Sequence, residues 1–177
     1  MNQTLMTETT RAELLRAEFD AAFSCTPPVA AGPLETLLAI RVGRSPYAIR
    51  LSQAIGLHVD KPITRLPGTP PEVLGIAGFR GTIATVFDLG VLLGTDATEA
   101  RRWLVLASNS PAVGFAFDQF EGHLQFSPEE IATATYSEHR KFLSIVQAVT
   151  DSMGEVRPIV NLSALIESIG TPDRSGT

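Results

Sequence analysis

The first 34 residues carry a helical pattern that the rest of the chain does not repeat. Thr10 and Glu13 have the spacing of a capping box, in which a hydroxyl and a carboxylate satisfy the first free N–H groups of a helix. A helix over 11–23 would then place apolar side chains along one face. These side chains are Leu15, Phe19, Ala22 and Phe23. Two consecutive prolines predict the end of this helix, and the segment up to residue 34 is typical of a linker.

From Glu35 onward, short apolar stretches alternate with turn residues. The stretches at 37–42 and 47–51 flank a Gly-Arg-Ser-Pro turn and predict a hairpin. Further strand candidates lie at 55–59, 63–66, 74–79, 82–87, 103–107 and 113–117. Asp88 has the position of an N-cap for a short helix over 89–93, which Gly94 closes. Short strands separated by turns favour small β-barrels, in which few strand edges remain exposed.

The region from 35 to 170 contains a weak internal repeat. An apolar strand runs into Asp88 in its first half and into Asn161 in its second, and a short apolar helix follows each. The turns Arg44-Ser45-Pro46 and Asn109-Ser110-Pro111 also resemble each other. We therefore divide the region into two similar halves, at about 36–94 and 102–168, and expect a flexible tail at 171–177.

Composition and charge are typical of a globular protein of the cytoplasm. Of the 177 residues, 44% are hydrophobic and 19% are charged. A net charge of −5 without a basic run argues against nucleic-acid binding. No stretch approaches the roughly 18 apolar residues of a membrane span, and the first residues do not form a signal peptide. The single cysteine, Cys25, cannot form an internal disulfide. We therefore predict a cytoplasmic protein without direct membrane insertion.

The residues that carry chemistry do not form a catalytic pattern. No two of His58, His123 and His139 have the spacing of metal ligands, and the chain has no GxSxG, P-loop or GxGxxG motif. Glu129 and Glu130 are a candidate acid–base pair, but the Ser-Pro before them favours the first turn of a helix. We predict no enzymatic activity, no metal and no cofactor.

Arg80 is a charged residue within an otherwise apolar and glycine-rich stretch, 75–81. At the tip of a hairpin its side chain would be solvated and inert. At the base of an interface groove its planar guanidinium would bind carboxylate or carbonyl groups. Composition alone does not favour either of these two interpretations.

Several short motifs follow one another in a distinctive order. They are a proline-bearing loop at 63–70, Val73-Leu74-Gly75-Ile76, Phe79-Arg80-Gly81, Val86-Phe87-Asp88-Leu89, and Val113-Gly114-Phe115-Ala116-Phe117-Asp118. In this order and spacing, the chain resembles the CheW family, the coupling proteins of bacterial chemosensory systems, over about 36–168. Three places depart from the family pattern. Gly56 stands near the family's glutamate, Gly78-Phe79 replaces Asn-Leu, and Thr85 replaces the usual proline.

The resemblance implies a mostly β fold, with two SH3-like, five-stranded β-barrel subdomains and short helices. It also implies a non-enzymatic adaptor, which bridges the cytoplasmic tip of a chemoreceptor and the regulatory domain of a CheA-type histidine kinase. Such an adaptor would be recruited to membrane receptor arrays. Carried over by position, the receptor-side groove would contain Leu51, Ala54, Arg80, Gly81 and Gly114.

Two other functions stay open at this point. The departures at 56, 78 and 85 are compatible with a divergent CheW-like scaffold for another pathway, such as surface motility or biofilm control. A small ligand-binding barrel would need converging polar groups in a deep pocket, and the sequence indicates none. In the N-terminal helix, Leu15, Phe19 and Phe23 would dock on the barrels or on a partner, or else belong to a flexible tail.

Overall fold

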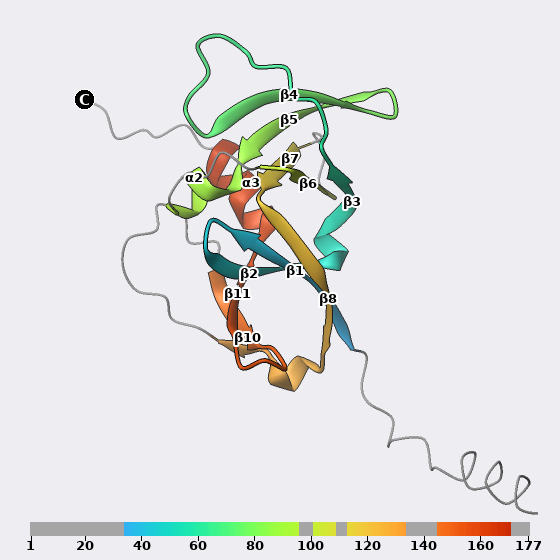
Figure 1. The fold of residues 1–177 in the computed structure, drawn as a ribbon, viewed down its shortest axis with the longest axis vertical. Helices are drawn as coiled ribbons and strands as arrows, with labels where there is room; N and C mark the ends of the chain where they lie inside the picture. The colour runs from blue at the N-terminus through green and yellow to red at the C-terminus, as the bar shows by residue number, and fades with distance from the viewer. Residues whose placement is uncertain (1–33, 96–100, 109–112, 134–144, 171–177) are drawn as a thin grey trace, which may run out of the picture. The chain divides into compact units, whose positions relative to one another are not determined.

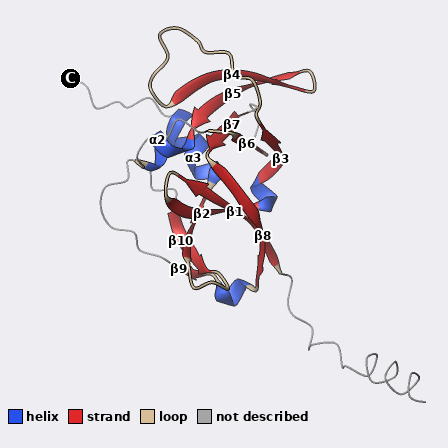
Figure 2. Ribbon diagram, in the orientation of Figure 1, coloured by secondary structure: helices blue, strands red, loops and turns tan. Residues whose placement is uncertain are grey.

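The computed structural model describes residues 34–95, 101–108, 113–133 and 145–170, which are mostly β (Figures 1 and 2). The strands are β1 (Glu35–Val42), β2 (Ser45–Arg50), β3 (Ala54–Val59), β4 (Val73–Phe79), β5 (Thr82–Asp88), β6 (Trp103–Ala107), β7 (Val113–Phe117), β8 (Gln119–Phe126), β9 (Ala132–Thr133), β10 (Ile145–Thr150) and β11 (Val156–Val160). The helices are α2 (Leu89–Leu93) and α3 (Leu162–Gly170), with single 3₁₀ turns η1 (Leu51–Gln53) and η2 (Pro128–Glu130). The helix predicted over 11–23 lies outside the described residues.

Two sheets divide these strands in an interleaved order (Figure 1). Sheet A has the order β8-β1-β2-β11-β10-β9, and sheet B has the order β3-β6-β7-β5-β4. The β1–β2 hairpin therefore lies among strands from later in the chain, and the β6–β7 hairpin lies among strands from earlier in the chain. Parallel pairing of β11 with β2, and of β5 with β7, joins each hairpin to its sheet.

The two sequence halves have the same order of elements but exchange their first hairpins. Strand for strand, β8-β1-β2-β11-β10 corresponds to β3-β6-β7-β5-β4, and a short helix follows both β11 and β5. The sheets consequently do not coincide with the halves at 36–94 and 102–168, since each sheet draws strands from both. Neither half contains all the strands of a sheet.

The central strands β1, β2, β6, β7 and β11 are buried on both faces, which explains their nearly continuous apolar runs. Successive side chains of a strand point to opposite faces. The largest core cluster lies between the two sheets and includes Tyr47 and Phe115, together with residues of α2 and α3. A second cluster, with Val86 and Leu104, belongs to sheet B, and a third, with Leu37, belongs to sheet A.

The helix that follows each of β5 and β11 begins at a capping side chain, as the sequence predicts for Asp88. The Asp88 carboxylate accepts hydrogen bonds from the N–H groups of the second and third residues of α2, at 3.0 and 3.3 Å. Gly94 ends α2 with φ of 65°, a conformation that glycine adopts without steric cost. The Asn161 side chain accepts from the N–H of Ala164 at 3.2 Å in the same way.

Other strand predictions need correction. The predicted strand at 63–66 is wrong, because only Thr64 forms an isolated bridge, to Ile76. Prolines at 62 and 67 flank this segment and lack the N–H that a strand ladder requires. The strands β8, β9 and β10 were not predicted, although Phe120, Leu124 and Phe126 alternate along β8. Gly122 stands at the one position of this face that lacks an apolar side chain, which weakens the pattern in the sequence.

Candidate functional site

Arg80 and Gly81 form the tip of the β4–β5 hairpin. Their φ angles are +47° and +87°, so both lie in the left-handed region. This conformation is uncommon for a residue other than glycine, and it fixes the direction in which the Arg80 side chain leaves the hairpin. Both residues are exposed. The structure therefore places Arg80 at a hairpin tip, and the surroundings of its side chain bear on whether the arginine is inert or belongs to an interface groove.

The Arg80 side chain lines a pocket of about 380 Å³, which we call the hairpin pocket. Residues of β3, of β6 and of the hairpin tip form its walls. They are Ile55, Gly56, Leu57, His58, Phe79, Arg80, Thr82, Leu106 and Ala107. Most of these residues are apolar and none is acidic. The pocket therefore combines apolar surface with a cation, a combination common at the centre of protein interfaces.

His58 fills the part of the hairpin pocket next to Gly56. A Cβ atom on Gly56 would lie 3.0 Å from Nε2 of His58. The imidazole packs against Phe79 with 4.8 Å between ring centroids, and Lys61 Nζ lies 5.1 Å from the centroid of the same phenyl ring. Burial lowers the pKa of His58, and the nearby charges of Lys61 and Arg80 lower it further. His58 is therefore mainly neutral at pH 7, and Lys61 and Arg80 supply the positive charge.

The other predicted groove residues, Leu51, Ala54, Gly81 and Gly114, do not line this pocket. Leu51, in η1, is 42% exposed, and Ala54 begins β3 just before the lining residue Ile55. Gly114 is buried in β7, where an added Cβ would lie 3.4 Å from a methyl carbon of Leu106. Gly114 can therefore influence the pocket through Leu106, whereas direct contact with a partner would require movement of the strand.

Sequence reasoning missed most of the pocket wall. Ile55 is 69% exposed although it belongs to a β-strand, because a register shift between β3 and β6 falls at this residue. The sequence could have identified His58 as a candidate, because it is a polar residue inside an otherwise apolar stretch at 55–59. Arg80 stands out in the same way at 75–81. The predicted N-terminal contact residues, Leu15, Phe19 and Phe23, lie outside the described residues.

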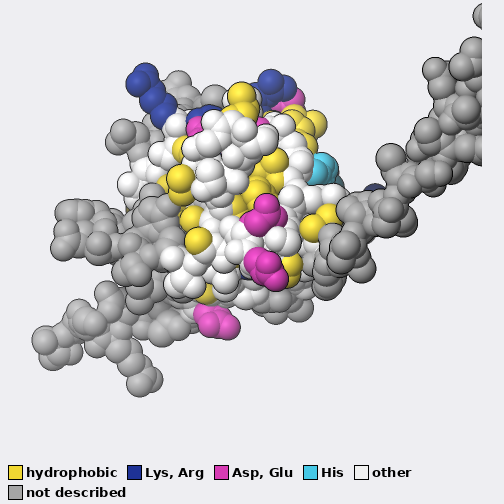
Figure 3. Space-filling model, turned by 90° about the horizontal axis from the view of Figure 1, so that it is seen from below, with side chains coloured by type: hydrophobic (Ala, Val, Ile, Leu, Met, Phe, Trp, Pro, Cys, Tyr) yellow, Lys and Arg dark blue, Asp and Glu magenta, His cyan; other side chains and the backbone are white. Residues whose placement is uncertain are grey.

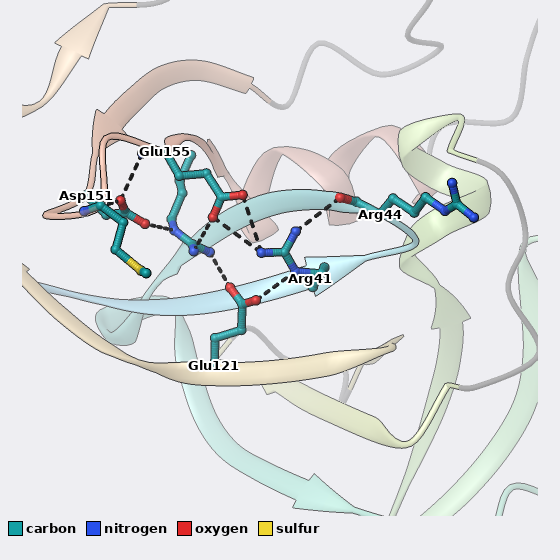
Figure 4. Close-up of polar contacts among 7 residues, drawn as sticks. Arg41, Arg44, Glu121, Asp151 and Glu155 are labelled. Carbon is teal, nitrogen blue, oxygen red and sulfur yellow. Dashed lines mark hydrogen bonds and ion pairs between the residues drawn. The ribbon is translucent and has the colours of Figure 1, made fainter.

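A second polar cluster, on sheet A, is satisfied by its own ion pairs (Figure 4). Arg157 of β11 is 5% exposed and reaches Asp151 at 2.8 Å, Glu121 at 2.6 Å and Glu155 at 2.6 Å. Arg41 of β1 reaches Glu121 at 2.7 Å and Glu155 at 3.3 Å. Since each of these three carboxylates accepts from an arginine, we assign the cluster a structural role and call it the Arg157 network.

The Arg157 network should lose its stabilising contribution as the pH falls below about 4.5. The hydrogen bond from Arg157 lowers the pKa of Asp151 below its ordinary 3.8. Burial alone would raise the pKa of Glu121, but hydrogen bonds from Arg41 and Arg157 leave it below its ordinary 4.5. Because the unfolded state then binds protons first, stability is complete above the unfolded pKa values and declines as pH falls toward the folded ones.

Urea unfolding from about pH 7 to about pH 3 measures this decline. Asp151→Asn removes one of the titrating groups, so the free energy of unfolding of this variant should fall less steeply with acid. An equally steep fall in Asp151→Asn would contradict the part assigned to Asp151.

The remaining candidate residues do not form a catalytic or metal site in the described ranges. Glu130 lies in η2, where its carboxylate accepts a hydrogen bond from the backbone N–H of Ser127 at 2.6 Å, as a capping residue does. In the described ranges, no three His, Cys, Asp or Glu side chains are grouped so that they could hold a metal ion. Within the same ranges, no helix has the length and apolarity needed to cross a membrane.

Comparisons with known proteins agree with this fold. Residues 36–170 match the family model described as CheW-like domain. The chemotaxis protein CheW of Bacillus subtilis (strain 168) is 21% identical over 136 residues, which cover 75% of this chain and 87% of the relative. The chemotaxis proteins CheW of Rhizobium meliloti (strain 1021) and Helicobacter pylori (strain ATCC 700392 / 26695) are 29% and 30% identical, with 63% and 56% of their lengths covered.

A solved structure is similar to the chain as well. The crystal structure of the scaffolding protein TtCheW from Thermoanaerobacter tengcongensis matches with a TM-score of 0.70 and 17% identity. The match covers 78% of this chain and 97% of that one. It confirms the predicted fold class, which is mostly β with two SH3-like subdomains.

Proposed function

Because the chain belongs to the CheW-like domain family, we propose that it is a non-enzymatic adaptor that couples chemoreceptors to a CheA-type histidine kinase. The observation that carries this proposal is the extent of the family match. Residues 36–170 include nearly every residue of both sheets and both helices, so the whole domain supports the assignment. The relatives named as chemotaxis and scaffolding proteins support a scaffold role. We also assign the protein to the cytoplasm, at receptor arrays.

We propose that the cytoplasmic tip of the receptor binds at the hairpin pocket and its margin. The pocket offers apolar walls and a cation, and its lining residue Ile55 adds exposed apolar surface, at 69% exposure. Exposed apolar groups close to a pocket are typical of a docking surface. An amphipathic helix of the receptor could lay its apolar face into such a groove.

A divergent scaffold for another pathway is the second candidate. The departure at Gly56 motivates it, since this glycine stands near the family's glutamate and His58 Nε2 would lie 3.0 Å from a Cβ added there. A panel of receptor tips and kinase regulatory domains from different pathways of the same organism would separate the two candidates by the set that binds.

Arg80→Glu should weaken receptor binding by about tenfold or more and leave the fold intact. The exposed Arg80 side chain contributes little to the core, whereas reversing its charge changes the pocket directly. Co-purification with receptor cytoplasmic fragments and with CheA-type regulatory domains measures binding, and circular dichroism measures folding. Arg44→Glu is the matched control, because Arg44 is exposed in the turn between β1 and β2 and its side chain points away from the Arg157 network (Figure 4).

Three outcomes decide between the assignments. Receptor binding that is lost in Arg80→Glu and kept in Arg44→Glu supports the receptor-side role of the hairpin pocket. An Arg80→Ala variant that unfolds would show a structural role for Arg80. Failure of the wild type to bind any receptor or kinase domain of chemotaxis would favour the scaffold of another pathway.

A further inference from the structure

The chain leaves sheet A along two neighbouring strands, β2 and β11, which pair in parallel (Figure 1). Ile49 of β2 lies opposite Val160 of β11, so the segments that follow them begin at the same end of the sheet. One segment is η1, which leads into β3 of sheet B. The other is Asn161, which leads into α3. The start of β3 and the start of α3 are therefore brought together by the parallel pairing.

The side chain of Gln53 connects these two starts. Its Nε2 donates to Oδ1 of Asn161 at 2.9 Å, and its Oε1 accepts from the backbone N–H of Leu162 at 3.1 Å. Leu162 is the first residue of α3, where a helix leaves an N–H group without an intrahelical acceptor. Because the same Asn161 oxygen also caps Ala164, the two backbone donors fix which amide atom faces which. Gln53 thus completes the cap of a helix that begins more than 100 residues later, since Gln53 and Asn161 are 108 positions apart.

The backbone of Gln53, by contrast, belongs to sheet B. Its carbonyl accepts from the N–H of Ser108 at 3.0 Å, which continues the β3–β6 ladder beyond the pair of Ala54 and Ala107. Ala54 also packs against the core cluster that contains Leu162 of α3. One residue therefore has its side chain fastened to α3 and its main chain fastened to sheet B.

Ile55 follows Gln53 by two positions and forms part of the wall of the hairpin pocket. Exposure alone does not distinguish this side chain, because hydrophobic side chains also lie among acidic ones on the face shown in Figure 3. Its position does, since β3 lies at the edge of sheet B and a register shift between Ala54 and Gly56 interrupts its ladder at Ile55. The place of Ile55 therefore depends strongly on what holds Gln53.

We propose that Gln53 is a positioning residue that couples α3 to the wall of the hairpin pocket. While α3 is docked, its first turn holds the Gln53 amide, and Gln53 holds the start of β3 so that Ile55 lines the pocket. When the first turn of α3 opens, the start of β3 opens with it. Coupling is reciprocal, so a partner bound at the pocket stabilises α3, and a partner that stabilises α3 favours binding at the pocket. The inference rests on the proposed function in that a partner binds there.

Native-state amide exchange of the full ¹⁵N-labelled chain tests the link without any partner protein. The amides of Ala54 and Ser108 report the start of β3, because each donates to a carbonyl of η1. The amide of Leu165 reports the first turn of α3, where it donates to the carbonyl of Asn161. Phe115, in the central strand β7, exchanges through global unfolding, and the three reporters should exchange faster than it.

The variant Ala164→Gly weakens α3 and should speed exchange of the Leu165 amide about fivefold, since glycine is the poorer helix former. Because α3 and the start of β3 open together, the amides of Ala54 and Ser108 should accelerate by the same factor. Gln53→Met keeps the length of the side chain and removes both hydrogen bonds. In this background, Ala164→Gly should accelerate Leu165 alone.

Two control variants separate the link from a general loss of stability. Asn161→Asp keeps an oxygen that can accept from both Gln53 Nε2 and the N–H of Ala164, so the common acceleration should remain. Ser52→Ala removes an exposed side chain of the same 3₁₀ turn and should leave the common acceleration in place as well.

Three results would each overturn the proposal. In the first, Ala164→Gly leaves the amides of Ala54 and Ser108 unchanged. In the second, their acceleration persists in Gln53→Met. In the third, all three reporters exchange as slowly as Phe115, which would mean that α3 and the start of β3 open only with the whole domain.

A receptor cytoplasmic fragment then tests the reciprocal effect. At a free concentration ten times its dissociation constant, the fragment should slow exchange of the Leu165 amide about tenfold in the wild type and leave it unchanged in Gln53→Met. Slowing that persists in Gln53→Met would overturn the link between the pocket and α3. A fragment that does not bind the wild type would count against the adaptor function, whereas the exchange measurements without a partner would still decide the role of Gln53.

Discussion

Replacing Arg157 by leucine is expected to lower the free energy of unfolding by about 3 kcal/mol. The Arg157 side chain is 6% exposed and forms ion pairs with Glu121, Asp151 and Glu155. Leucine would fill part of the space but leave the Asp151 carboxylate, 5% exposed, without its arginine. A carboxylate that loses its partner in a buried site is costly, because water cannot replace the lost interaction. Urea unfolding followed by circular dichroism measures the effect.

The expected loss stays near the lower end of the range for a broken buried pair, because the network is only partly cut off from water. Glu155 is 35% exposed, and Arg41 still pairs with Glu121 after the change. Arg102→Leu is the matched control, since Arg102 and Asp60 form a pair at 63% and 57% exposure. This exposed pair should contribute little. A similar loss of stability in both variants would show that burial does not increase the contribution of the Arg157 network to the free energy of unfolding.

Local features of the fold could be predicted from the sequence because nearby residues determine them. Asp88 and Gly94 enclose the short helix α2 with a cap at each end. The pattern at 74–79 and 82–87 places a hairpin with Arg80 at its tip. In each case the interaction joins residues only a few positions apart, so the residue types along the chain carry the information.

The hairpin pocket could not be predicted in the same way, because three distant segments form it. Ile55, Arg80 and Leu106 come together only after β6 pairs with β3 and the two halves exchange hairpins. Nothing in the local pattern specifies that exchange. It follows from two parallel pairings between strands of different halves, and such pairing leaves no signature in a single stretch of sequence.

Arg157 carries the same sequence signal as Arg80, a charged residue within an apolar stretch, but the sequence alone did not lead to a prediction for it. It is a charged residue in an apolar strand, Val156–Val160, just as Arg80 is a charged residue in an apolar hairpin. The structure gives these two arginines opposite environments. Arg157 is buried and paired with three carboxylates, whereas Arg80 is exposed and faces an apolar pocket. The sequence cannot distinguish them, since Glu121 is 36 residues away from Arg157.

Val86→Asp is expected to unfold sheet B, with a loss of about 4 kcal/mol or more in the free energy of unfolding. Val86 is fully buried and packs in the sheet B cluster with Phe79 and Leu104. The change removes the burial of an apolar side chain and adds a carboxylate without a partner. Since a domain of this size has about 5–15 kcal/mol of stability in total, much of the variant should be unfolded on mild heating.

Ile83→Asp provides the matched control for this experiment, because it introduces the same carboxylate on the same strand. Ile83 is 68% exposed and lies three residues before Val86, on the opposite face of β5. Its replacement leaves the core intact and should change the melting temperature little. Thermal unfolding of both variants separates the two effects. An unchanged melting temperature for Val86→Asp would contradict the core position of Val86. A large loss in both variants would instead indicate that β5 as a whole does not tolerate a new negative charge.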